Sequence, residues 1–213
     1  MLKVYGFSKV NAVARGNTRD LRVLWALEEM QLPFELAGMD HPAHDLNTDA
    51  YRHLSPFEQI PAIDDDGLLL SESAAILVYL AKKAGKLIPS DPVGESQVVR
   101  WCFAAMSSTE LPLMSILMLD WVKDDGCSKY REFMVGWANR QLTGLERWLD
   151  GREYIATESF TVADILMAHV LAAVKDSSLI KPFPRVGSYR DRCLARPAWK
   201  RTIEDYCARV EAA

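Results

Sequence analysis

The sequence predicts a mixed α/β domain followed by an all-helical domain. Three observations lead to this fold class. Strand-like and helix-like segments alternate through residues 1–84, residues 85–92 are rich in glycine and proline, and residues 93–213 carry helical spacing with almost no strand signal. We therefore expect one domain at 1–84, a linker at 85–92 and a second domain at 93–213.

The first domain has a recognisable order of elements. Asp66-Gly67 is a strong hairpin turn signal, and the helix after it begins with hydroxyl residues. The order strand, helix, strand, then helix, two strands and helix is that of a thioredoxin-like domain with a mixed four-stranded sheet. The expected elements are a strand at 2–5, a helix at 19–30, a strand at 34–37, a weak helix at 46–54, strands at 61–63 and 68–70, and a helix from 73.

The second domain is expected to be a helix bundle. Pro112 lies within a long helix, where it removes a hydrogen bond and should bend the axis. Thr161 and Asp164 form a capping-box start, so Asp164 has a structural interpretation, and His169 is expected to be a core residue. Two apolar stripes mark helices: Trp101, Ala104, Ala105, Ser108 and Leu111 in one, and Phe133, Trp137, Leu142, Leu145 and Trp148 in the other.

Composition limits the classes of partner. The 213 residues are 49% hydrophobic with a net charge of −4, which argues against nucleic acid or an anionic membrane as a partner. We find no apolar run of membrane-spanning length, and Met1 leads directly into a strand without a leader, so we expect a cytoplasmic protein. The scattered cysteines show no metal spacing and are expected to be reduced: Cys102, Cys127, Cys193 and Cys207.

Residues 55–76 combine two features that could recognise the backbone of a ligand. Pro61 opens a short strand and leaves the backbone groups of Ile60 unpaired, and a cis bond before Pro61 would aim those groups out of the sheet. Ser71-Glu72-Ser73 then precede a helix, whose first amides favour a small carboxylate, while Glu72 could pair with an ammonium group. Taken singly, each feature is equally the ordinary start of a strand or helix.

Together and in this order, these residues resemble the glutathione-binding half of the glutathione transferase family. The resemblance implies that Ile60, before a cis Pro61, pairs with the cysteinyl backbone of glutathione. It also implies that Glu72 and Ser73 hold the γ-glutamyl group, with Gln59 as a helper. It covers essentially the whole chain and implies glutathione as co-substrate, no separate cofactor, and a homodimer packed through the helix after Ser73 and the first long C-terminal helix.

The thiolate-stabilising group is expected between Tyr5 and Asp20, where family members carry a Tyr, Ser, Thr or Cys. Here the chain departs from the family, because the connection at 6–20 is unusually long. Thr18 is the first choice as the thiol-facing hydroxyl, although it could equally be a helix N-cap. The further candidates at the catalytic or glutathione-facing positions are Asn11, Ser8, Asn17 and Arg15, with Tyr5 only if the first strand is longer than expected.

The resulting interpretation is a glutathione transferase that adds the thiolate to a hydrophobic electrophile, with peroxide reduction as a second activity. No cysteine precedes Cys102, which argues against chemistry through an N-terminal cysteine. A glutathione-binding carrier or regulatory protein with little turnover is the alternative, and isomerase work on a maleyl-type substrate ranks lower. The electrophile pocket is expected between the domains, although its candidate apolar residues are more often core: Trp101, Met106, Leu113, Leu117 and Trp121.

Overall fold

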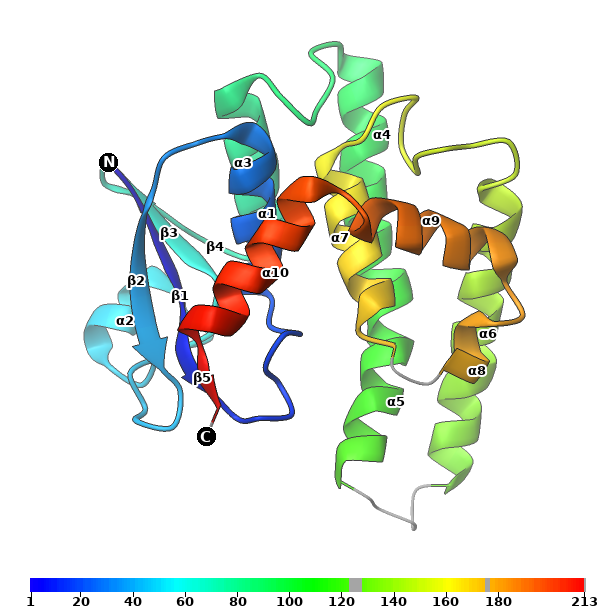
Figure 1. Cartoon of the computed structure of the whole chain (residues 1–213), viewed down its shortest axis with the longest axis horizontal. Helices are drawn as coiled ribbons and strands as arrows, with labels where there is room; N and C mark the ends of the chain where they lie inside the picture. The colour runs from blue at the N-terminus through cyan, green and yellow to red at the C-terminus, as the bar shows by residue number, and fades with distance from the viewer. Residues whose placement is uncertain (123–127, 175–176, 213) are drawn as a thin grey trace. The chain divides into compact units, whose positions relative to one another are not determined.

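The computed structural model describes residues 1–122, 128–174 and 177–212, and the chain divides into two compact units (Figure 1). The first unit comprises residues 1–86 together with 196–213, and the second comprises residues 87–195. The expected division differs in one respect, because it assigned residues 196–213 to the helical domain. Each unit has its own buried core and is described separately.

The first unit is built on a mixed sheet with the strand order β2-β1-β3-β4. β1 (Leu2–Val10) runs parallel to β2 (Glu35–Asp40) and antiparallel to β3 (Ala62–Asp65), and β3 pairs antiparallel with β4 (Leu68–Ser71) through the turn at Asp66-Gly67. This is the four-stranded mixed sheet that the sequence predicted. A short fifth strand, β5 (Glu211–Ala212), pairs parallel with the far end of β1.

β1 is longer than the strand expected at residues 2–5. Its second half gains partners that lie far away in the sequence, since Phe7 pairs with Met39 and Lys9 pairs with both Asp40 and Glu211. A ladder made with distant segments leaves no signal in the local pattern of residues 6–10. The connection to the next helix is therefore residues 11–19, shorter than expected.

Helices cover both faces of this sheet. α1 (Asp20–Met30) and α3 (Ser73–Ala84) lie on one side, and α2 (Asp49–Leu54) lies on the other (Figure 1). α2 begins later than expected because Thr48 caps it, with its Oγ1 accepting a hydrogen bond from Tyr51 N at 3.2 Å. This arrangement buries the hydrophobic side of α1, where Trp25 is fully inaccessible.

The C-terminal helix α10 (Pro197–Arg209) packs against α1 within the first unit. Trp25 and Trp199 have ring centroids 4.8 Å apart, and Arg196 makes two hydrogen bonds to Glu29, at 2.6 and 2.8 Å. A close, tilted aromatic contact and a bidentate ion pair are specific as well as favourable contacts. They explain why residues 196–212 belong with the sheet, although their helical pattern resembles that of the preceding bundle.

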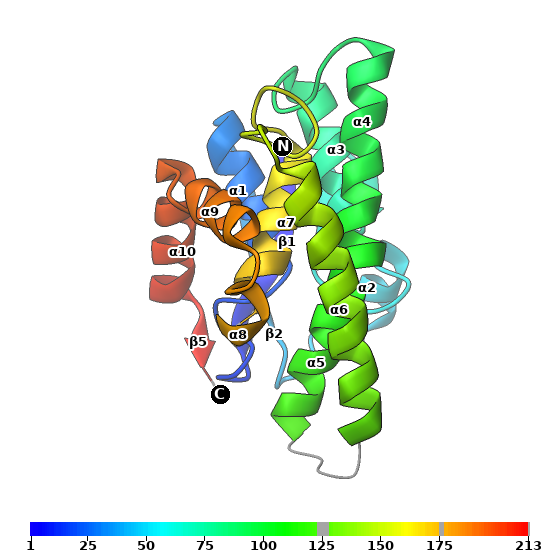
Figure 2. The same cartoon turned by 90° about the vertical axis from the view of Figure 1, so that its right-hand side faces the viewer.

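The second unit is a helix bundle arranged around α7 (Val162–Ala172), in which residues 162–171 are all buried. Figure 2 shows this unit facing the viewer. α7 contacts α4, η1, α5 and α9, so it forms the centre of the core, and His169 is buried there as expected. The helices are α4 (Pro92–Phe103), η1 (Ala104–Thr109), α5 (Glu110–Val122), α6 (Ser128–Trp148), α7, α8 (Ser177–Ile180) and α9 (Pro184–Leu194).

A π-helical segment, η1, lies just before Pro112 in the long helix of residues 92–122. The amide of Glu110 bonds the carbonyl of Ala105, five residues back, instead of four. The wider turn absorbs one extra residue and changes which side chains face inward. Leu111, expected on the buried stripe, is 51% exposed, whereas Leu113 and Ile116 are buried. Phe133 of the second predicted stripe is also exposed.

One expectation about membranes needs correction. Among the described residues, one helix, Pro92–Val122, is long and apolar enough to cross a membrane by length and composition alone. The expectation considered unbroken apolar runs, which Ser107, Ser108 and Glu110 interrupt, whereas average hydropathy tolerates such residues. Core helices of soluble proteins meet the same criterion, so this feature by itself is weak support for a membrane span.

The start of α7 is fixed by the predicted capping box. Asp164 accepts hydrogen bonds from the backbone amides of Thr161 and Ile155, both at 2.8 Å, and from Tyr189 Oη at 2.9 Å. Burial raises the pKa of this carboxyl group, and these donors oppose the rise by stabilising its charge. Asp164 thus joins the loop before α7, α7 itself and α9, as its structural interpretation required.

Asp164→Ala is expected to lower the free energy of unfolding by about 3 kcal/mol or more, since several buried donors lose their acceptor at once. Urea denaturation followed by circular dichroism measures this change. Asp191→Ala is the matched control, because Asp191 is an exposed acid on α9. Equal stability of the two variants would contradict the structural role of Asp164.

Candidate functional site

The β3–β4 hairpin brings the two halves of the predicted glutathione site together. Ala62 pairs with Ser71, so Ile60 and Pro61 lead into the ladder at the same end at which Glu72 and Ser73 leave it. The peptide bond between Ile60 and Pro61 is cis, which is the conformation that the sequence suggested. Ile60 is buried in a small core with Tyr51, Leu54 and Ala62, which fixes the backbone of this segment.

Glu72 has a backbone conformation that is rare for a residue with a side chain. Its φ is +71° and its ψ is 112°, and its carbonyl accepts the first hydrogen bond of α3, from Ile76 N at 3.0 Å. Within the described part of the chain, the exposed Glu72 side chain makes no capping hydrogen bond to the helix. Strained residues of this kind gather at ligand sites, where the surrounding fold holds them in place.

Ser73 is the first residue of α3 and is 3% exposed. Arg22, the third residue of α1, donates from Nη1 to Ser73 Oγ at 3.2 Å. Arg22 is itself almost fully buried, so its positive charge acts in a medium of low dielectric constant. Sequence reasoning missed Arg22; the available signal was a charged residue in the middle of an otherwise apolar helical run.

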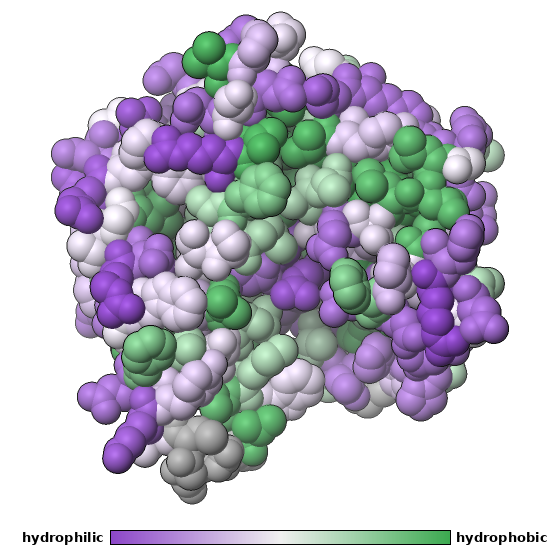
Figure 3. All heavy atoms as spheres, turned by 180° about the vertical axis from the view of Figure 1, so that it is seen from behind, coloured by the Kyte–Doolittle hydropathy of each residue, from purple (hydrophilic) through white to green (hydrophobic). Residues whose placement is uncertain are grey.

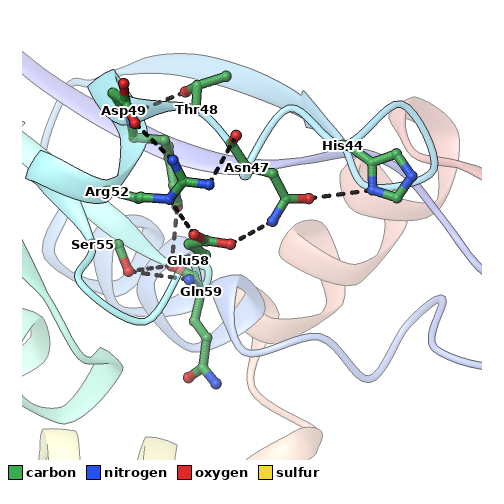
Figure 4. Close-up of polar contacts among 9 residues, drawn as sticks. His44, Asn47, Thr48, Asp49, Arg52, Ser55, Glu58 and Gln59 are labelled. Carbon is green, nitrogen blue, oxygen red and sulfur yellow. Dashed lines mark hydrogen bonds and ion pairs between the residues drawn. The ribbon is translucent and has the colours of Figure 1, made fainter.

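The loop before Pro61 is held by a network of side chains on α2 and in the segments directly before and after it (Figure 4). Ser55 Oγ donates to the carbonyl of Gln59 at 2.9 Å and accepts from the amide of Gln59 at 3.1 Å. Arg52 pairs with Glu58, and Asn47 donates to the other oxygen of Glu58. The Gln59 side chain is exposed and points away from this network in Figure 4, so its side-chain amide group is open to solvent.

Thr18 lies at a buried position and not on an open surface. Its Oγ1 is 2.6 Å from Tyr206 Oη, and the hydroxyl also forms a hydrogen bond with Asp20. The cap position of α1 is Arg19, so Thr18 is not the N-cap residue that the alternative interpretation described. A single hydroxyl has one proton to donate, and here two neighbouring oxygens compete for it.

The other predicted residues of this region are spread over β1 and the following loop. Ser8 lies within β1, and Gly38 of β2 lies so close that a Cβ added there would be 2.9 Å from Ser8 Cβ. Asn11 is exposed, and its carbonyl accepts from the amides of Ala14 and Arg15. Asn17 is half-buried directly before Thr18, while Arg15 is exposed and reaches the carbonyl of Cys207.

Asp20 is a fully buried acid that the sequence analysis did not single out. Its Oδ2 accepts a hydrogen bond from Phe7 N at 2.9 Å, while Oδ1 has no hydrogen-bond partner among the described residues. Burial raises the pKa of Asp20, and the hydrogen bond from Thr18 and the charge of Arg209 oppose that rise. Burial, and after it the negative charge of Asp20, also raise the pKa of Tyr206, to about 12.

Other candidate chemistry is limited. Within residues 1–122, 128–174 and 177–212, no group of three or more His, Cys, Asp or Glu side chains is arranged to hold a metal ion. Cys102 and Cys193 are buried and Cys207 is exposed, none of these three is in a disulfide, and Cys127 lies outside the described residues. A depression of about 400 Å³ in the second unit is lined by Leu87–Pro89 and Thr157–Thr161, none of them a predicted site residue.

Comparison with known proteins agrees with this geometry. The N-terminal domain family of glutathione S-transferases matches residues 21–83, and the corresponding C-terminal domain family matches residues 126–197. A glutathione S-transferase from Hyoscyamus muticus is 32% identical over 199 residues, which cover 86% of this chain and 92% of the relative. The chain belongs to the glutathione S-transferase family. It is therefore an enzyme of this class, with glutathione transferase function.

Further glutathione S-transferases resemble the chain in sequence and structure. Glutathione S-transferase 3 of Schizosaccharomyces pombe is 30% identical over 88% of this chain and 84% of the relative. A family member from Pseudomonas fluorescens Pf-5, solved with two glutathione molecules bound, is 27% identical with a TM-score of 0.84 over 95% of this chain and 92% of that one. A Burkholderia graminis transferase, also with two glutathione molecules per subunit, is 29% identical with a TM-score of 0.80 and covers 95% and 87%.

Glu72→Gly is expected to raise the free energy of unfolding by about 1 kcal/mol, because glycine adopts a positive φ without the side-chain clash. Thermal or urea denaturation measures the change. Gln31→Gly is the matched control, because Gln31 also has a positive φ, of 58°, at the exposed end of α1. A loss of stability in Glu72→Gly alongside a gain in Gln31→Gly would mean that the Glu72 backbone is not strained.

Proposed function

We propose that the first unit binds glutathione along the line from Gln59 to Ser73. In this proposal the backbone of Ile60, before Pro61, pairs with the cysteinyl part. Glu72 receives the α-ammonium group, and Ser73 with the first amides of α3 receives the γ-glutamyl carboxylate. The observation that carries the proposal is Glu72 itself, an exposed acid held at φ +71° at an uncapped helix start. Helix N-termini favour carboxylates through their free amides and their dipole.

Arg22 strengthens this assignment of the γ-glutamyl end. Its guanidinium contacts Ser73 Oγ and adds a buried positive charge close to the expected carboxylate. Glu72 supplies the opposite charge on the solvent side. A zwitterionic α-amino acid group therefore meets complementary charges at both of its ends.

For the sulfur, we propose that Asn17 and the neighbouring loop amides stabilise the thiolate. Thr18 remains a candidate, but its proton is already directed to Asp20 or Tyr206, so it would have to give up one of those partners to serve the sulfur. Asn17 carries two amide hydrogens and lies one residue earlier, half-buried. Donors aimed at a developing negative charge lower the pKa of a thiol and favour attack on an electrophile.

The remaining parts of the assignment rest on the family and on surface chemistry. We infer a hydrophobic electrophile as second substrate, a cytoplasmic location, and a homodimer. Large apolar side chains are exposed in both units, including Phe57 at 74%, Val93 at 73% and Phe103 at 69%. The face drawn in Figure 3 likewise carries several groups of hydrophobic side chains among polar ones. Apolar groups of this kind are typical of surfaces that meet a partner.

The double variant Glu72→Gln with Ser73→Ala is expected to weaken glutathione binding at least tenfold, because charge-assisted hydrogen bonds contribute about 1.5–3 kcal/mol each. Isothermal titration calorimetry measures the affinity. The matched control is Glu158→Gln with Ser159→Ala, an exposed Glu-Ser pair in the second unit. Unchanged affinity would mean that the start of α3 is not the binding site. Binding by the unmodified protein without turnover of an aromatic halide or an organic hydroperoxide would argue against transfer itself.

Asn17→Ala is expected to lower kcat with an aromatic halide by about 10²-fold, the effect of removing one donor to a developing anion. Its glutathione affinity should stay within about twofold of the original value, because the backbone and γ-glutamyl contacts remain. Asn11→Ala is the control, since Asn11 is exposed at the end of β1. If Asn11→Ala lowers kcat and Asn17→Ala does not, the sulfur lies at the other end of the loop.

A further inference from the structure

The loop of residues 11–19 rests on the C-terminal helix of the same unit. Arg15 donates from Nη2 to the carbonyl of Cys207, and Gly16 donates its amide to Tyr206 Oη. A Cβ at Gly16 would lie 3.9 Å from Ile203 Cδ1, so the loop backbone passes close to the face of α10. Residues nearly two hundred positions apart, such as Thr18 and Tyr206, are therefore in direct contact.

A buried hydrogen-bond chain runs from this helix into the start of α1. Tyr206 Oη lies 2.6 Å from Thr18 Oγ1, and either hydroxyl can donate the proton of this hydrogen bond. Thr18 can then donate to the Asp20 carboxylate. All three side chains are buried, and hydrogen bonds between them are strengthened by the low local dielectric constant.

Asp20 continues the chain to β1. Asp20 Oδ2 accepts a hydrogen bond from Phe7 N. The backbone carbonyl of Phe7 in turn accepts a hydrogen bond from Arg209 Nη1 at 2.7 Å. The charged and titratable groups that act on Asp20 come from two helices, Tyr206 and Arg209 on α10 and Tyr51 on α2. Because Asp20 Oδ1 has no hydrogen-bond partner in the described part of the chain, the acid depends strongly on the donors that it has.

We propose that Tyr206 is a positioning residue for catalysis, which acts through Thr18 and Asp20 to hold the Asn17 loop against the glutathione sulfur. The C-terminal helix is then part of the catalytic apparatus, although it contributes no group that touches the substrate. This inference rests on the proposed function, in which the loop stabilises the thiolate. It also gives the buried Thr18 hydroxyl a role that differs from direct contact with the sulfur.

The consequence is a separation of kcat from binding. The chain from Tyr206 ends at Asp20 and Phe7, whereas the proposed glutathione contacts lie at Gln59–Pro61 and at the start of α3. Loss of the Tyr206 hydroxyl should therefore loosen the thiolate-stabilising loop and leave the main binding contacts intact. Misplacement of a catalytic group by about 1 Å can cost about 10²-fold in rate, so a partial loosening should cost about tenfold.

The decisive experiment uses Tyr206→Phe in the full-length protein, with Tyr189→Phe as its matched control. Tyr189 is a fully buried tyrosine in the second unit whose hydroxyl bonds a buried polar side chain, that of Asp164, so the control repeats the chemical change elsewhere. For Tyr206→Phe we expect kcat to fall about tenfold, glutathione affinity to stay within about twofold, and the pKa of bound glutathione, followed by thiolate absorbance, to rise. Tyr189→Phe should lower Tm without moving that pKa.

Thr18 provides a second, independent variant. Thr18→Val should reproduce the loss of kcat, Thr18→Ser should restore it, and combining Thr18→Val with Tyr206→Phe should add no further loss, because both break one chain. If Tyr206→Phe does not fold, the two Thr18 variants decide the question. An unchanged thiol pKa and kcat in Tyr206→Phe and Thr18→Val would overturn the positioning role. Failure of the unmodified protein to bind glutathione would instead overturn the proposed function.

Discussion

A fully buried carboxylate, that of Asp20, is the constraint on which the first unit depends. It lies at the start of α1 and accepts a hydrogen bond from the amide of Phe7 on β1. Through Thr18 it is linked to Tyr206 on α10. An acid in such a place costs free energy unless donors surround it, so the segments that supply those donors are held together. The sheet, the loop and the C-terminal helix therefore form one cooperative piece, and the path of residues 11–19 follows from it.

The proposed glutathione contacts and the proposed sulfur-facing loop are built in different ways. The half from Gln59 to Ser73 is local, because a hairpin of eight ladder residues brings Pro61 and Glu72 to the same end of β3 and β4. The segment proposed to face the sulfur is held by contacts among β1, the loop of residues 11–19 and α10, such as Phe7 N to Asp20 and Thr18 to Tyr206. A local half tolerates change elsewhere in the chain, whereas an assembled half is sensitive to every segment that contributes to it.

The same distinction decides what the sequence could predict. The strand after Pro61, the Asp66-Gly67 turn and the Thr161–Asp164 cap depend on neighbours within a few residues. The turn and the cap are present as predicted, and β3 begins one residue later than expected, at Ala62. The extension of β1 to Val10, the burial of Thr18 and the placement of residues 196–212 depend on partners far away in the sequence. Local periodicity holds no information on such partners, which is why Asp20 and Tyr206 were not singled out.

The π-helical segment η1 has a consequence for how the long helix of the second unit can vary. Each residue of an α-helix turns the following side chains by about 100°, so one extra residue in a turn rotates everything after it. Before η1, the apolar stripe that begins at Trp101 follows regular α-helical spacing. After η1 the inward-facing positions are shifted along the sequence, so Leu113 and Ile116 face inward in place of Leu111. In evolutionary terms η1 behaves as a single-residue insertion that the helix has absorbed. Deleting one residue there would restore a regular helix and turn the buried face of α5 towards solvent.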